Sequence, residues 1–275
     1  MLLFGYLDKM FGLINNGHNI LNGIAHPNVT KYFLFSAGPI EFTMIMLLWL
    51  LFVTKLGPKF MKHKKPMELR TLMILYNFML VVINVYFTYI SIKWLEFGRK
   101  SLDPKLTELN RWVENHDDFL HHKIIYFYTK LFDLLDTVIF VLRKKSNQVS
   151  FLHVYHHFMV PVMGYLTIVY CPQTVVVEVF CFLNSIIHTI MYSYYLLSAF
   201  GPKIQPYLWW KRYITRLQII QFIGFVIYVL YSVIFKDLSD YPKMIMYIVP
   251  IQPFFFFYMF FMFYIKSYDN KSKSI

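Results

Sequence analysis

The sequence predicts an all-α, polytopic membrane protein with seven transmembrane helices. Of its 275 residues, 57% are hydrophobic and 20% are aromatic. Only 15% are charged, whereas a soluble domain usually has about 25%. The apolar residues also fall in long runs rather than in the short periodic runs of a soluble core. Lipid is therefore the predicted solvent for much of the chain.

Seven stretches approach the length of about 20 apolar residues that a helix needs to cross the hydrocarbon core. In chain order they are residues 33–54, 71–92, 124–142, 150–171, 174–197, 213–235 and 245–265. The third and fifth stretches contain charged residues within the apolar run. Short connections join the stretches and no internal repeat is visible, so residues 1–275 are predicted to form one domain.

The orientation follows from the Lys and Arg content of alternate connections. The connections after the first, third and fifth spans and the tail after the seventh carry net charges of +5, +3, +3 and +2. The N-terminal segment and the remaining connections together carry only +1. The N-terminus is therefore predicted to be lumenal and the C-terminus cytosolic. The net charge of +12 is explained by this topology and not by nucleic-acid binding.

Several short features bear on the compartment. Residues 1–10 lack the pattern of a signal peptide, and two cysteines are too few for a disulfide framework or a cysteine metal site. Lys271 and Lys273 match the dilysine pattern for retrieval to the endoplasmic reticulum, although a generic basic tail would look similar. Asn28 begins a glycosylation sequon on the predicted lumenal side, close to the first span.

Ionisable side chains at membrane depth cost several kcal/mol and usually mark function. The fourth span contains His153, His156 and His157, whose spacing places them on one face of a helix. The fifth span contains Asn184 and His188 one helical turn apart. Imidazole is a weak base, a nucleophile and a metal ligand, so the histidine box is the predicted centre of a catalytic site inside the helical bundle.

The polar stripes of the neighbouring spans are the other site candidates. The third span has Lys130, Asp133 and Asp136 along one face, Tyr192 and Tyr195 continue the stripe of the fifth span, and a polar patch in the sixth span consists of Arg216, Gln218 and Gln221. Each has a plain structural interpretation. The lysine and an aspartate of the third span could neutralise each other, and the glutamines could hold helices together by hydrogen bonds.

The box spacing fits two chemistries. In the first, a membrane desaturase or hydroxylase, His153, His156, His157 and His188 would bind a single metal, because these are too few ligands for a di-iron centre. In the second, an imidazole forms an acyl-imidazole by attacking a thioester, or acts as a general base, without any metal. A seven-span receptor or transporter is the alternative outside enzymes, but neither needs such a box.

Four motifs together resemble the ELO family of fatty-acid elongases of the endoplasmic reticulum. In chain order they are KLFDLLDT at 130–137, leading to RKK at 143–145, HVYHH at 153–157, NSIIHTIMYSYY at 184–195 and TRLQIIQ at 215–221. The matches extend from the third predicted span to the sixth. One departure is Asp133, where many members have Glu, so its side chain has a shorter reach.

The resemblance implies a very-long-chain 3-oxoacyl-CoA synthase, an acyltransferase without a cofactor. It would condense an acyl-CoA with malonyl-CoA to 3-oxoacyl-CoA, CO2 and CoA. The tract at 148–152 is similar to the branch that acts on very-long-chain or polyunsaturated acyl groups. The expected partners are three other enzymes of the elongation cycle: a 3-ketoacyl reductase, a 3-hydroxyacyl dehydratase and an enoyl reductase. The chain could also form a homo-oligomer.

In the mechanism that we hypothesise for this condensation, His156 is the nucleophile. His188 orients or activates malonyl-CoA with Asn184 as a hydrogen-bond donor, while His153 and His157 set tautomers and stabilise charge. The predicted cytosolic loops would bind the CoA phosphates through Arg143, Lys144, Lys145, Lys211 and Arg212. The other substrate-binding candidates are Lys130, Asp133, Asp136, Tyr192, Tyr195, Arg216, Gln218 and Gln221.

Two variants of this mechanism remain open. His156 could act only as a base in a one-step condensation. Alternatively, Cys181, two turns before His188 on the same face, could carry the acyl group as a thioester. A cysteine in a membrane helix more often serves as a small packing residue.

Overall fold

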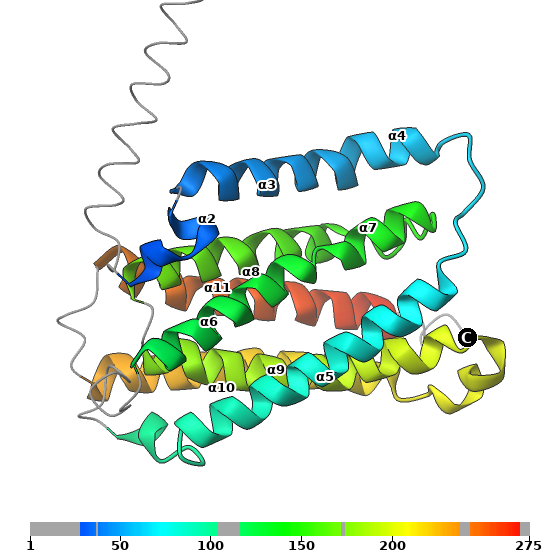
Figure 1. Cartoon of the computed structure of the whole chain (residues 1–275). Helices are drawn as coiled ribbons and strands as arrows, with labels where there is room; N and C mark the ends of the chain where they lie inside the picture. The colour runs from blue at the N-terminus through cyan, green and yellow to red at the C-terminus, as the bar shows by residue number, and fades with distance from the viewer. Residues whose placement is uncertain (1–27, 37, 104–115, 172–173, 237–242, 270–275) are drawn as a thin grey trace, which may run out of the picture. The chain divides into compact units, whose positions relative to one another are not determined.

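The computed structural model describes residues 28–36, 38–103, 116–171, 174–236 and 243–269, most of which lie in helices (Figure 1). The chain divides into two compact units. Unit 1 contains the elements up to residue 66 together with residues 116–171, and unit 2 contains the remaining described elements. The single domain predicted from the sequence stays a prediction, and Lys271 and Lys273 lie outside the described residues.

Unit 1 consists of eight described elements. They are η1 (Val29–Lys31), α2 (Phe33–Ser36), α3 (Pro39–Leu51), the π-helical segment η2 (Phe52–Leu56), α4 (Gly57–Met61), α6 (His116–Phe132), α7 (Leu135–Leu142) and α8 (Phe151–Tyr170). Helix α6 packs on α8, α4 packs on α7, and α3 lies along α8. Aromatic rings fill much of the core, where Tyr165 of α8 stacks on Phe35 and Phe42 at centroid distances of 5.1 and 4.5 Å.

The first membrane helix begins later than the sequence predicts. A span was expected over 33–54, but α2 ends at Ser36 and the backbone turns at Gly38, which has a φ of +83°. Glycine adopts this left-handed conformation without a Cβ clash, and Pro39 then occupies the first position of α3, where its missing N–H costs nothing. The continuous helical stretch is therefore Pro39–Met61.

The third predicted span, 124–142, is two helices rather than one. Helix α6 ends at Phe132 and α7 begins at Leu135. At the break, the N–H of Leu134 donates to the carbonyl of Leu131 at 3.2 Å and that of Asp136 to Asp133 at 3.1 Å, so tighter turns replace the i to i−4 ladder. The indole Nε1 of Trp49 in α3 donates to the Leu134 carbonyl at 3.0 Å. A residue of the first span thus binds the backbone at the break.

Unit 2 consists of seven described elements. They are α5 (Arg70–Trp94), η3 (Lys100–Leu102), α9 (Val175–Ala199), η5 (Pro202–Tyr207), α10 (Lys211–Phe235), α11 (Lys243–Tyr264) and the π-helical segment η6 (Ile265–Asp269). Helix α5 runs along α9, α9 contacts α10, and α10 contacts α11. The Arg70 side chain donates to the carbonyls of Ala199 and Phe200, at 3.1 and 2.5 Å, and so caps the C-terminus of α9.

Four stretches among the described residues are long and apolar enough to cross a membrane. They are Pro39–Met61, Arg70–Trp94, Val175–Ala199 and Lys211–Phe235. They correspond to the first, second, fifth and sixth predicted spans. These four spans therefore confirm the prediction of a helical, multi-pass membrane protein. The other three segments include the broken α6–α7 pair and the histidine-bearing α8, whose polar side chains lower their hydropathy.

Candidate active site

The histidine box lies in the first two turns of α8. Ser150 is the N-cap of this helix, and its Oγ accepts a hydrogen bond from the backbone N–H of His153 at 3.3 Å. The ring centroids of His153 and His157 are 4.1 Å apart, and those of His156 and His157 are 5.4 Å apart. The three imidazoles therefore form one cluster, as the spacing predicted, and His157 is buried at its centre.

One hydrogen bond joins this cluster to α7. The Nε2 atom of His153 lies 3.0 Å from the Oγ1 atom of Thr137, which is completely buried. The Phe140 ring lies against the same imidazole at a centroid distance of 5.2 Å. A fixed partner on one ring nitrogen holds the ring in place. Helix α7 thereby orients one histidine of the box.

Thr137 belongs to the first of the four sequence motifs, but no role was predicted for it. A signal was present, because Thr137 follows Asp133 by four residues and follows Asp136 directly, at the end of the first polar motif. A hydroxyl at that position can donate to or accept from a neighbouring ring nitrogen. Thr137 is therefore added to the candidate site as a positioning residue.

The polar stripe of the third span is buried beside the break between α6 and α7. The Lys130 ammonium lies 2.9 Å from the Oδ2 atom of Asp133, and these side chains are only 5% and 6% exposed. Asp136, at the start of α7, is buried as well. The lysine also lies 5.0 Å from the centroid of the Tyr126 ring. The Lys130–Asp133 ion pair that the sequence suggested is thus formed, and both of its charged groups are buried.

In unit 2, the second polar stripe lies along α9. Asn184, His188 and Tyr192 are all buried, with Tyr192 completely so. The ring centroids of His188 and Tyr192 are 5.5 Å apart, and those of Tyr192 and Tyr195 are 6.1 Å apart. Tyr76 of α5 meets Tyr192 edge-on at 6.5 Å. Three residues of the stripe predicted from the sequence are therefore buried, and the stripe is packed against α5 through Tyr192.

The three polar residues predicted near the start of the sixth span have different surroundings. Arg216 is exposed, and its Nε donates to the hydroxyl of Tyr264 in α11 at 2.7 Å. The Nε2 atom of Gln218 lies 3.7 Å from the Sδ atom of Met191 in α9. Gln221 is buried. The structure thus places the arginine beside α11 and one glutamine beside α9, and not all three in one shared patch.

The basic residues predicted to meet CoA lie at two places, one in each unit. Lys144 and Lys145 are exposed and Arg143 is partly buried, in the turn between α7 and α8. Lys211 and Arg212 are exposed at the start of α10. Each group is available to an anionic ligand within its own unit.

Comparison with known protein families shows to which family this chain belongs. The model of the ELO family (GNS1/SUR4) matches residues 34–275. The chain belongs to the ELO family. This confirms the resemblance that the four motifs indicated.

Similar ELO proteins carry names that describe an activity. The chain is 38% identical to very long chain fatty acid elongase 1 of Mus musculus over 218 residues, which is 77% of this chain and 75% of the relative. It is 41% identical to elongase 1 of Homo sapiens over 203 residues, covering 72% and 70% of the two chains. It is 43% identical to elongase 4 of Homo sapiens over 184 residues, covering 64% and 55%.

Two alternative chemistries suggested by the sequence of this ELO chain use a metal ion or the thiol of Cys181. Within the described residues, no three His, Cys, Asp or Glu side chains form a group that could hold a metal ion. Cys181 is buried in α9, three residues before Asn184 and two turns before His188.

Proposed function

We propose that this ELO protein catalyses the decarboxylative condensation of a long-chain acyl-CoA with malonyl-CoA. The names of its relatives support fatty-acid elongation with very-long-chain products. The observation that carries the proposal within the chain is the packed imidazole cluster of α8, with one ring held by Thr137. A cluster of weakly basic nucleophiles in an apolar helix bundle suits acyl transfer, because water that would hydrolyse an acyl intermediate is excluded.

The proposed reaction has two stages. First, a ring nitrogen of His156 attacks the thioester carbonyl, the C–S bond breaks, and the imidazole N–H proton leaves with the thiolate as free CoA. In the second stage malonyl-CoA loses CO2, and the electron pair of the broken C–C bond forms an enolate. The enolate carbon attacks the acyl-imidazole, giving 3-oxoacyl-CoA. The imidazolate of His156 then takes a proton from solvent.

The neighbouring groups support this nucleophile in the proposed scheme. His153, held by Thr137, and the buried His157 would set the tautomer of the cluster and stabilise the charge that develops on the thioester oxygen. The roles predicted for Asn184 and His188, hydrogen bonding to and activating malonyl-CoA, stay predictions. The CoA phosphates would bind, as charge-assisted partners, to Arg143, Lys145, Lys211 and Arg212.

The proposed topology places these groups in the membrane. The chain would cross seven times, with the N-terminus in the lumen of the endoplasmic reticulum and the C-terminus in the cytosol. The four membrane-length stretches and the excess of Lys and Arg in alternate connections support this arrangement. The product, a 3-oxoacyl-CoA, requires reduction, dehydration and a second reduction, so the three enzymes of those steps are the proposed partners.

The test uses purified protein and arachidoyl-CoA without malonyl-CoA. The two-stage reaction predicts one equivalent of free CoA per active protein and a mass increase equal to one acyl group. His156→Ala should abolish both, whereas His63→Ala, in an exposed segment outside the box, should abolish neither.

Two results would contradict parts of the proposal. If CoA is released only after malonyl-CoA is added and no adduct ever forms, His156 is a base in a one-step condensation. If no 3-oxoacyl-CoA forms from any acyl-CoA of 16 to 26 carbons with malonyl-CoA, the proposed function itself is wrong.

A further inference from the structure

A cavity of about 750 Å³ lies in unit 1, where η2 and α4 face the turn between α7 and α8. Its walls are mainly apolar and include Val53, Met61, Phe140 and Val149. The box histidines do not line it, because the first turn of α8 faces the cavity with Phe151 and Val154. The cavity is thus separate from the imidazole cluster. It lies behind the histidine face of the same helix.

Two lysines stand at the rim of this cavity. Lys62 follows α4, and Lys144 lies in the turn after α7. The Lys144 backbone is left-handed, with a φ of +54°, and its ammonium donates to the Lys62 carbonyl at 3.3 Å. An ammonium has three N–H donors, so two of them can reach a further acceptor. Two cations therefore lie at the rim of an apolar cavity, and a hydrogen bond holds one of them, Lys144, in place.

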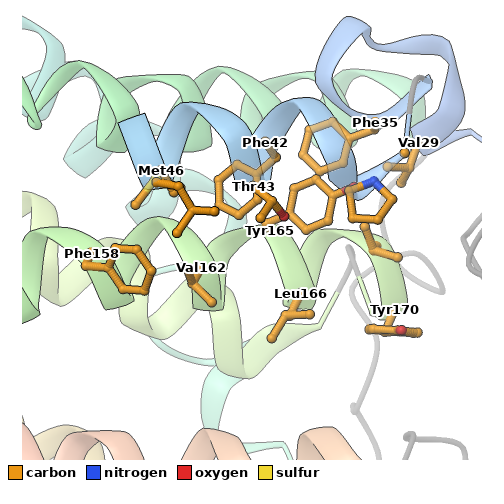
Figure 2. Close-up of a pocket in the computed structure, with 14 residues that line it drawn as sticks. Val29, Phe35, Phe42, Thr43, Met46, Phe158, Val162, Tyr165, Leu166 and Tyr170 are labelled. Carbon is orange, nitrogen blue, oxygen red and sulfur yellow. The ribbon is translucent and has the colours of Figure 1, made fainter. Parts of the chain in front are cut away.

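A second cavity lies along the same helix. This second cavity, of about 200 Å³, lies between α3 and α8 and is lined by apolar and aromatic side chains (Figure 2). Along α8, Val154 lines the first cavity, while Phe158 and Val162 line the second. Residues three or four apart share a helix face. The two cavities therefore lie on one apolar seam, with the lysines at one end only.

The two faces of α8 exclude the acyl-CoA substrate as the natural occupant of this seam. A thioester carbonyl bound along Val154 and Phe158 would lie on the side of α8 away from the histidine cluster, and His156 could not attack it. The cavity wall is also exposed beyond its rim, since Phe151 is 73% exposed. An occupant can therefore enter from the surrounding lipid.

We propose that this seam binds an anionic glycerophospholipid of the cytosolic leaflet. Its phosphate lies between Lys62 and Lys144, and one acyl chain extends along α8 toward Val162. The charge of the site complements such a headgroup, because the connections that hold these two lysines carry net charges of +5 and +3. Anionic lipids of that leaflet bind basic residues at the membrane surface. The choice of leaflet rests on the topology proposed above, but the binding site itself does not rest on the elongase activity.

The test measures binding of phosphatidylinositol and phosphatidylcholine with identical chains to the full-length protein in neutral detergent. Phosphatidylinositol should bind at least tenfold more tightly. The double variant Lys62→Gln/Lys144→Asn removes both charges, and asparagine tolerates the left-handed backbone. We expect its Kd for phosphatidylinositol to rise roughly ten- to thirtyfold. Its Kd for phosphatidylcholine should hardly change.

Two controls separate a defined site from a diffuse basic surface. The variant Lys59→Gln/Lys65→Gln removes two exposed charges of the same connection that do not line the cavity, and its Kd should stay within about threefold of the original. The variant Thr54→Trp fills the cavity from its exposed wall and should weaken binding of both lipids.

Three outcomes would overturn the proposal. An equal loss in the Lys59/Lys65 control would show that only surface charge attracts the lipid. Unchanged binding in Thr54→Trp would show that no acyl chain enters the cavity. Displacement of bound phosphatidylinositol by acyl-CoA at its KM, with a matching rise of that KM in the Lys62/Lys144 variant, would show that the seam is a substrate entry instead. All variants are first checked for a single peak in size-exclusion chromatography.

Discussion

Replacing Asp133 by alanine leaves the Lys130 ammonium buried without its carboxylate. The two groups are 2.9 Å apart and nearly inaccessible. At an effective dielectric constant of about 20, their gross Coulomb attraction is about 6 kcal/mol. Desolvation opposes much of this energy, yet removing one partner of a buried pair typically costs about 3–5 kcal/mol. For a chain of this size, that loss corresponds to a decrease in Tm of roughly 6–20 °C.

The assay is thermal unfolding in detergent, followed by the fraction of protein that still elutes as a single species. The double variant Lys130→Met/Asp133→Leu removes both charges together and should recover at least half of the lost stability, because neither member of the pair is then left charged and buried without the other. Glu96→Gln is the matched exposed control. Hydrogen bonds from Lys100 and Arg99 lower the pKa of Glu96 below 4.5, but this surface cluster should contribute little to Tm.

If Asp133→Ala unfolds at the same temperature as the original protein, the reasoning about a buried ion pair is refuted. The same holds if the double variant is less stable than Asp133→Ala. That result would mean that the two side chains contribute mainly through other contacts and not through their mutual charge.

Three further predictions follow from close contacts and a buried ammonium. Gly57→Ala should destabilise by about 1–3 kcal/mol in denaturant unfolding, since a Cβ there would lie 2.7 Å from the Cγ1 of Val141. Thr137→Val should lower the elongation kcat roughly ten- to hundredfold with an unchanged Tm, because it removes the partner of the His153 ring. Burial lowers the pKa of Lys236 to about 8, so stability should rise with pH between about 8 and 10.5, where the unfolded chain binds more protons.

Each of these predictions has a control that can contradict it. Gly224→Ala meets no atom within 4 Å and should stabilise by about 0.5–1 kcal/mol, so an equal loss at both glycines would argue against a steric cause. Thr137→Ser keeps the hydroxyl and should restore most of the kcat. Lys236→Met should flatten the alkaline rise in stability, and a rise that persists must come from other groups.

The sequence predicted the chemistry of the buried groups better than the geometry of the helices. Ionisable residues at membrane depth are costly, so Lys130, Asp133 and the box histidines could be found as outliers against an apolar background. Their local grouping then follows from helical spacing alone. The Lys130–Asp133 pair and the imidazole cluster are both formed as the spacing predicted.

Helix boundaries were harder to predict, because hydropathy does not record backbone hydrogen bonding. Hydropathy around Leu134 does not signal that α6 ends at Phe132. Likewise, the amino-acid composition of Phe52–Leu56 does not distinguish this π-helical segment from the α-helices beside it. The turn at Gly38 and Pro39 did carry a signal, since proline is favoured at the first position of a helix, but the prediction of a span over 33–54 did not use it. The Thr137–His153 bond depends on how α7 packs against α8, which no single segment encodes.

The hydrogen bond from Trp49 to the Leu134 carbonyl has a consequence for how the protein is made. The two residues are 85 positions apart, so the first span is synthesised and meets the membrane well before its acceptor exists. An indole N–H has no partner in hydrocarbon. Until the residues of the α6–α7 break are synthesised, the indole N–H of Trp49 lacks the acceptor that it has in the folded protein. The first span therefore reaches its final hydrogen bonding only after the third has been made.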